Sequence, residues 1–260
     1  MKVLTKQVLI ALSIFYLLLL SGCDEDELNI PTVTIKLNFT HNWDGEEVSI
    51  SDFNDFKFTT EAGDVLSIER LRYVVSDIEV INSAREVSEY DLYQLIDLSE
   101  NTSFTLQLPG EFRAGIYNDI AFTFGLDNQD NTKNYPDLNS ANFNVPAMLG
   151  GGYHYMQLDG KFINSNNEEQ GYNYHAIRAV DISGDEPVFP LDTFFTVNLG
   201  TVNIVDDVEI EVKMNIAEWF KNPNTWELNE LNQVLMPNPG AQIQMSQNGK
   251  SVFTKGSISQ

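Results

Sequence analysis

Two stretches of strict two-residue alternation constrain the fold of this chain most strongly. Residues 32–41 place valine, isoleucine, leucine, phenylalanine and finally histidine at every second position, and residues 207–216 alternate in the same way. Side chains of a strand point alternately to its two faces, so each stretch predicts a strand with one core face and one solvent face. A chain built from such strands buries its apolar faces by stacking sheets.

Further β-rich segments occupy residues 56–60, 64–68, 71–81, 93–98, 102–108, 118–125 and 192–200. The segment 71–81 is apolar on both faces in its first half, which predicts a central strand. Residues 217–221 predict a short helix ended by a proline, and one or two more are expected between 228 and 253. We therefore expect an all-β fold, an antiparallel β-sandwich with short peripheral C-terminal helices, in a single domain over residues 31–260.

The N-terminus carries the pattern of an exported lipoprotein. A basic start and an apolar run over residues 8–20, too short for a comfortable membrane span, lead into Leu-Ser-Gly-Cys at 20–23. We interpret residues 1–22 as a lipoprotein signal peptide, Cys23 as the acylated first residue of the mature chain, and 23–30 as an acidic tether. Acidic residues directly after that cysteine also resemble the surface-export signal of Bacteroidetes lipoproteins. We expect an outer-membrane lipoprotein of the cell envelope that faces the periplasm or the cell surface.

Composition restricts the partners of the chain. It holds 38 acidic and 15 basic residues, a net charge of −23, so nucleic acid is a poor partner and cations or a basic protein surface are attracted. Cys23 is the single cysteine, and its acylation leaves no disulfide and no thiolate for metal binding or nucleophilic catalysis.

Two of the three histidines lie in one predicted hairpin. His154 and His175 flank a polar turn at residues 164–170, and alternation places His154 with Met156 and His175 with Ile177, so both are expected to face the core. A tight turn would place the two histidines directly opposite, with Cβ atoms roughly 5 Å apart. A longer turn would slide them apart along the same face.

These residues are candidate metal ligands. Imidazole nitrogen suits Cu(II), Zn(II) and Cu(I), and thioether sulfur favours Cu(I). His154 and His175 form the best pair, His41 at the end of the first strand is the third candidate, and Met148 and Met156 are the candidate sulfur ligands. Alternatively, an inward-facing histidine is an ordinary hydrogen-bonded core residue.

Other functions are open from the sequence. Four tyrosines of the hairpin, Tyr153, Tyr155, Tyr172 and Tyr174, are assigned to the outer face, where they form either ordinary cross-strand pairs or an aromatic platform of a binding module. The long polar segment 126–149 is typical of a functional lid or rim. Its Asp127, Asp130 and Asp137 offer calcium ligands, although the glycine and closing glutamate of an EF-hand are missing.

An enzyme is the weaker hypothesis. The chain has no G-x-S-x-G elbow, no H-E-x-x-H motif and no phosphate-binding loop. So acidic a chain offers many carboxylate pairs of the kind that glycosidases use, but none stands out.

Four segments in order resemble the MbnP-type copper-binding protein family: LRYVVSDI at 71–78, YNDIAFTFGLD at 117–127, GYHYMQLDG at 152–160 and Tyr-His at 174–175. The resemblance implies an exported β-sandwich with a copper ion, bound in some members by histidine and an oxidised tryptophan that a di-haem partner enzyme makes. It points most clearly to His175, with His41 in the first-strand position. The chain departs from the family pattern at 144–149, which holds no tryptophan, and Trp43, Trp219 and Trp226 lie elsewhere.

These observations together favour an exported, lipid-anchored protein that binds copper for acquisition, storage or transfer and has no catalytic turnover. The alternative is a metal-free cell-surface binding module for protein or glycan.

Overall fold

The computed structural model describes residues 30–100 and 104–260, and residues 32–260 form one compact unit. The signal peptide, Cys23 and most of the acidic tether lie outside the described residues. Within the described part of the chain, no helix has both the length and the apolar character that a membrane crossing requires.

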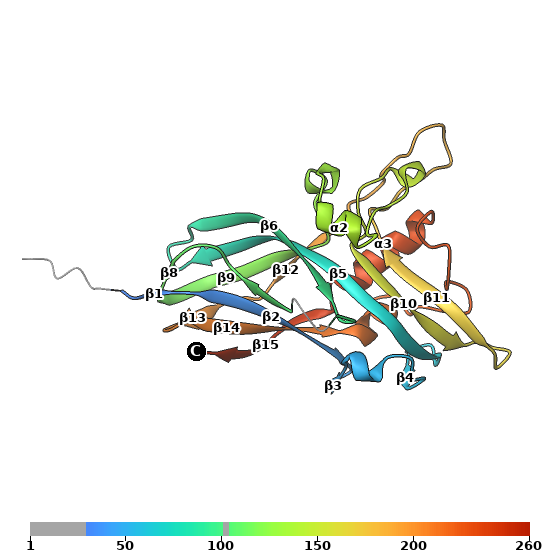
Figure 1. Cartoon of the computed structure of the whole chain (residues 1–260), viewed down its shortest axis with the longest axis horizontal. Helices are drawn as coiled ribbons and strands as arrows, with labels where there is room; N and C mark the ends of the chain where they lie inside the picture. Colours follow the sequence, from blue (N-terminus) through green and yellow to red (C-terminus); the bar gives the residue numbers. More distant parts are fainter. Residues whose placement is uncertain (1–29, 101–103) are drawn as a thin grey trace, which may run out of the picture. The chain divides into compact units, whose positions relative to one another are not determined.

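The larger sheet has eight strands and carries β5 at its centre, as the sequence predicted (Figure 1). Its main path runs β11-β10-β5-β9-β12, with β4 and β6 paired to β5 and β13 paired to β9. The strands are β4 (Phe58–Thr59), β5 (Val65–Asn82), β6 (Val87–Asp97), β9 (Gly115–Phe124), β10 (Met156–Ile163), β11 (Glu169–Ala176), β12 (Phe195–Asn198) and β13 (Val202–Ile204).

The smaller sheet has five strands in the order β15-β14-β2-β3, with β7 paired to β2. They are β2 (Ile35–Trp43), β3 (Glu46–Glu47), β7 (Thr105–Gln107), β14 (Val208–Asn215) and β15 (Phe253–Ser259), and a separate pair joins β1 (Thr32–Val33) to β8 (Phe112–Arg113). The two alternating stretches become β2 and β14, which pair in parallel, whereas the other strand pairs are antiparallel. The all-β sandwich is thus confirmed, with one parallel pair inside it.

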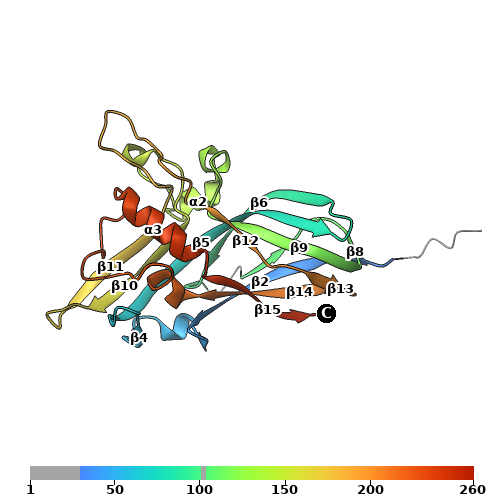
Figure 2. The same ribbon diagram turned by 180° about the vertical axis from the view of Figure 1, so that it is seen from behind.

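Short helices follow β14, as expected. The 3-10 helix η4 (Ile216–Phe220) comes directly after the strand, and α3 (Pro239–Gly249) contacts η4 and β11 (Figure 2). Strand β15 was not predicted; the tail was expected to be helical up to residue 253.

An aromatic core joins the two sheets. Phe39 of β2 meets Phe122 of β9 with ring centroids 5.5 Å apart, and Phe122 meets Phe253 of β15 at 5.4 Å. Phe124 contacts Trp219 of η4 at 5.2 Å. Burying one such side chain contributes about 1.5–3 kcal/mol, so this continuous cluster is the main stabilising feature of the domain.

Candidate metal centre

His154 and His175 meet in space, with ring centroids 5.2 Å apart and ring planes at 87°. The predicted hairpin exists as β10 and β11, but its turn takes in residues 164–168, so His175 lies opposite Gln157 in the register. His154 precedes β10 by two residues and is free of the strand's register. The rings therefore converge although the two backbones are not directly paired.

The pair lies on the outer face of the larger sheet, which corrects the predicted core-facing orientation of both histidines. Tyr174, its neighbour on β11, is fully buried and packs on Trp226 with ring centroids 4.6 Å apart. Because side chains alternate along a strand, His175 then points outward, and 16% of its side-chain surface is exposed to solvent. The prediction failed because Ile177, used to assign the face, lies beyond the end of β11 at Ala176.

The segment between β9 and β10 covers His154. The segment contains η2 (Asp130–Thr132), α2 (Pro136–Ser140) and η3 (Ala147–Leu149). The carbonyl of Phe143 accepts hydrogen bonds from the backbone N–H and from Nδ1 of His154, both at 2.8 Å. Under this cover His154 is 4% exposed, and burial lowers its pKa to about 4, against a smaller raising effect of the Phe143 hydrogen bond. The ring is therefore neutral at pH 7 and able to bind a metal ion.

The hydrogen bonds fix which nitrogen of each ring carries a lone pair. A carbonyl oxygen only accepts, so His154 carries its proton on Nδ1 and its lone pair on Nε2. That Nε2 atom is buried and has no hydrogen-bond partner among the described residues. His175 donates from Nε2 to the carboxylate of Asp159 at 2.7 Å, which leaves its lone pair on Nδ1.

Asp159 is the polar anchor of the pair. Burial alone would raise its pKa, but the hydrogen bond and charge of His175, with Asn173 and Arg70, lower that pKa to about 2. The Nε atom of Arg70 lies 2.6 Å from Oδ2. The carboxylate is therefore ionised at any physiological pH.

The residues present fit a copper ion. A buried polar atom without a partner costs free energy, which a bound ion would remove at Nε2 of His154. A second imidazole stands beside it, and imidazole nitrogens suit Cu(I) and Cu(II).

Comparison with known proteins agrees with the fold. The family model named MbnP matches residues 32–237, most of the compact unit. The chain belongs to the MbnP family. Among solved structures, MbnP from Methylosinus trichosporium matches with a TM-score of 0.53 and 13% identity, covering 88% of this chain and 99% of that one. No curated protein matches the chain.

In this MbnP-family chain, His41 stands apart from the pair. It faces the core, as predicted, and its Nε2 lies 3.1 Å from the hydroxyl of Tyr73 between the two sheets. Tyr73 points inward to Phe39, whereas Arg72, the preceding residue of β5, points to the face that carries the histidine pair. The larger sheet thus separates His41 from His154 and His175, so the structure does not bring the third candidate ligand to the pair.

The two candidate methionines do not join the pair either. Met156 is fully buried on the inward face of β10, opposite Tyr73 of β5. Met148 lies on η3 with 73% of its side chain exposed. The structure therefore gives the MbnP pair no sulfur ligand from these residues.

The tyrosines expected on the outer face are all buried, at 3% exposure or less: Tyr153, Tyr155, Tyr172 and Tyr174. The hydroxyl of Tyr172 donates to the carbonyl of Ser67 at 3.0 Å and that of Tyr174 to the carbonyl of Trp219 at 2.9 Å. These four tyrosines therefore do not form an exposed aromatic platform, and their side chains are part of the packed interior of the MbnP fold.

Sequence reasoning missed the residues that hold the pair. Asp159, Phe143, Asn173 and Arg70 were not singled out. The one available signal was a carboxylate at 159 on the polar parity of a strand that precedes a histidine strand. No sequence pattern predicts that the backbone carbonyl of Phe143 fixes the orientation of the His154 ring.

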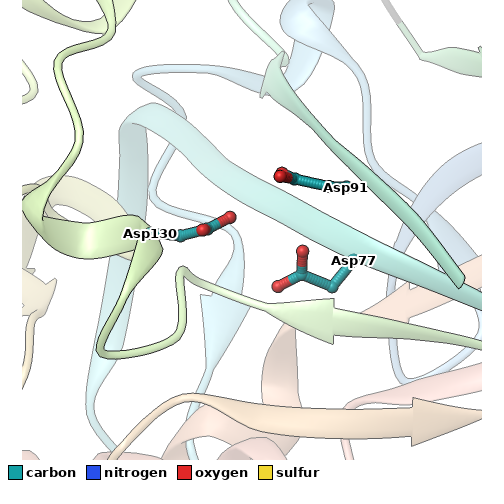
Figure 3. Close-up of side chains that lie close together, drawn as sticks. All are labelled: Asp77, Asp91 and Asp130. Carbon is teal, nitrogen blue, oxygen red and sulfur yellow. The ribbon is translucent and has the colours of Figure 1, made fainter.

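Three aspartates form a separate cluster: Asp77 of β5, Asp91 of β6 and Asp130 of η2, each with an oxygen within 4.8 Å of the others (Figure 3). Burial, with a smaller contribution from the neighbouring carboxylates, raises the pKa of Asp77 to about 6. Lys133 lies 2.6 Å from Asp130 and 2.9 Å from Asp91 and neutralises part of the charge.

This cluster differs from the calcium site considered from the sequence. Only Asp130 of the three loop aspartates belongs to it. Asp137 accepts instead from the hydroxyl of Tyr93, and Asp127 lines an adjoining cavity of about 360 Å³. The loop therefore does not form a self-contained calcium site, because its aspartates point to different neighbours.

Proposed function

We propose that this MbnP-family protein binds a copper ion between His154 and His175 and serves the acquisition, storage or transfer of copper. The observation that carries the proposal is the buried Nε2 atom of His154, which has no partner among the described residues and belongs to a ring 5.2 Å from that of His175. A neutral lone pair in a sheltered place is costly to maintain unless it receives a ligand.

Charge and donor chemistry support the same conclusion. The net charge of −23 concentrates cations around the protein. In each ring one nitrogen donates a hydrogen bond to a protein acceptor, which leaves the lone pair of the other nitrogen available to bind an ion. The partly exposed His175 gives the ion a way in from solvent.

The proposal includes export and anchoring. Cleavage before Cys23 and its acylation would hold the protein to a membrane of the cell envelope. A di-haem redox partner is carried over from the family resemblance. A partner that oxidises a tryptophan would find none within residues 144–149 of this chain.

Titration of the purified protein with Cu(I) and with Cu(II), each against a competing chelator, tests the site. We expect one tightly bound ion in the parent and a loss of at least tenfold in affinity in His154→Ala and in His175→Ala. His41→Asn is the matched control, because it replaces a buried histidine on the far side of the sheet, and it should bind like the parent.

Two results would reject the proposal. The parent protein taking up no copper would leave the pair without a metal role. Equal uptake by the parent and both alanine variants would place copper elsewhere on the chain.

A further inference from the structure

We infer that Asp159 is a positioning residue, which orients His175 so that Nδ1 is the nitrogen offered to the metal ion. The inference rests on the copper site proposed above. It concerns the carboxylate behind the ligand, which does not itself touch the ion.

Asp159 is held on every side. It lies on β10 with 6% exposure, opposite Asn173 of β11. Its Oδ1 accepts from Nε2 of His175 at 2.7 Å and from Nδ2 of Asn173 at 2.6 Å, and its Oδ2 accepts from Nε of Arg70 at 2.6 Å. A carboxylate with both oxygens occupied cannot rotate without breaking a charge-assisted hydrogen bond, so it is a rigid reference point for the imidazole.

The bond to Asp159 decides which nitrogen remains available. Because Nε2 of His175 donates to the carboxylate, that nitrogen has no lone pair, and Nδ1 is the atom left for an ion. His154 has the reverse arrangement, with Nδ1 committed to Phe143 and Nε2 left. The two rings, at 87° to each other, therefore present opposite nitrogens.

The carboxylate also acts through its charge. An anion hydrogen-bonded to the far side of an imidazole makes the ring a stronger donor, and loss of such a partner typically weakens metal binding by about 10- to 100-fold. The attraction scales with the charge of the ion, so Cu(II) gains more from it than Cu(I).

The test compares Asp159→Asn with the parent in Cu(II) and Cu(I) titrations. We expect a loss of about 10- to 100-fold in Cu(II) affinity and a smaller loss for Cu(I). The matched control is Asp64→Asn, which removes another buried carboxylate, 8% exposed and bonded to Leu228 and Asn229, and should leave copper affinity unchanged.

A second measurement uses the metal-free parent protein, so it does not depend on whether any variant folds. Long-range ¹H–¹⁵N correlation spectra at pH 7.5 should show His175 protonated at Nε2 and His154 protonated at Nδ1, with the Nε2 proton of His175 exchanging slowly. His175 protonated at Nδ1 alone would overturn the inference. So would Asp159→Asn that binds Cu(II) as the parent does.

These outcomes separate this inference from the proposed function. Copper binding by the parent that needs His175 but is indifferent to Asp159 leaves the copper site standing and removes the positioning role. Failure of the parent to bind copper removes both.

Discussion

His41 should make the protein lose stability as the pH falls from 6.5 to 4. Burial lowers its pKa from 6.5 to about 4, and its side chain is 4% exposed. Between these pH values His41 is protonated in the unfolded chain but neutral in the folded protein, so the free energy of unfolding rises with pH. The contribution is fully present above pH 6.5 and is lost as the pH falls to about 4. A difference of about 2.5 pH units at ~1.36 kcal/mol per unit gives about 3 kcal/mol.

Urea unfolding of the parent and of His41→Asn, followed at several pH values between 4 and 7.5, measures this contribution. The variant loses the hydrogen bond to Tyr73 and is expected to be less stable at pH 7. Its curve of unfolding free energy against pH should be flatter than the parent's by up to about 1.4 kcal/mol per pH unit between 4 and 6.5. His154 changes stability with pH in the same direction as His41, and Asp77 in the opposite direction. Both contributions are common to the two proteins and cancel in the difference. Parallel curves would refute a buried, neutral His41.

Three further changes have expected outcomes. Gly160→Ala would place a methyl group 2.0 Å from the carbonyl oxygen of Ser67, so the free energy of unfolding in urea should fall by about 1–3 kcal/mol or more. Gly171→Ala should be tolerated, because its methyl group would come close only to the movable side chain of Gln233, at 3.3 Å, and would meet the carbonyl of Gly160 at an ordinary 3.9 Å. Asp77→Asn should stabilise the protein by about 1 kcal/mol above pH 6, where the half-buried carboxylate is ionised at a cost, and the gain should vanish as the pH falls to 3.8. Cys23→Ala should release the protein from the membrane fraction of cells, and unchanged partitioning would exclude acylation at Cys23 as the anchor.

Most of the fold was predictable because it depends on local alternation. The period-2 pattern predicted β2 and β14. The centre of the larger sheet was predicted from a segment of β5 that is apolar on both faces, as a strand buried on both sides requires. Strand β15 escaped prediction because, after Phe253, its residues are mostly exposed and carry no alternating pattern. The parallel pairing of β2 with β14 depends on contacts between residues some 170 positions apart, which no local pattern encodes.

Of the candidate site, the sequence predicted the pairing of His154 with His175 but not its geometry or the residues that hold it. His154 and His175 do meet, yet the face they occupy was assigned from alternation that extends past the strand ends. The face of β11 is decided by Tyr174, whose ring packs on Trp226, and that partner lies far along the chain. Asp159 was visible as a polar strand residue, but its bond to His175 follows only from the register of β10 and β11.

The position of the pair outside the sandwich has a physical cause. Phe39, Phe122 and Phe253 fill the interior, and the one histidine there, His41, is bonded to Tyr73, so an ion placed among them would lose its hydration with little in return. The outer face of β10 and β11 instead offers polar anchors, and the segment 126–149 shelters it from solvent. A site built from a sheet surface and a connecting segment can change its ligands without disturbing the core.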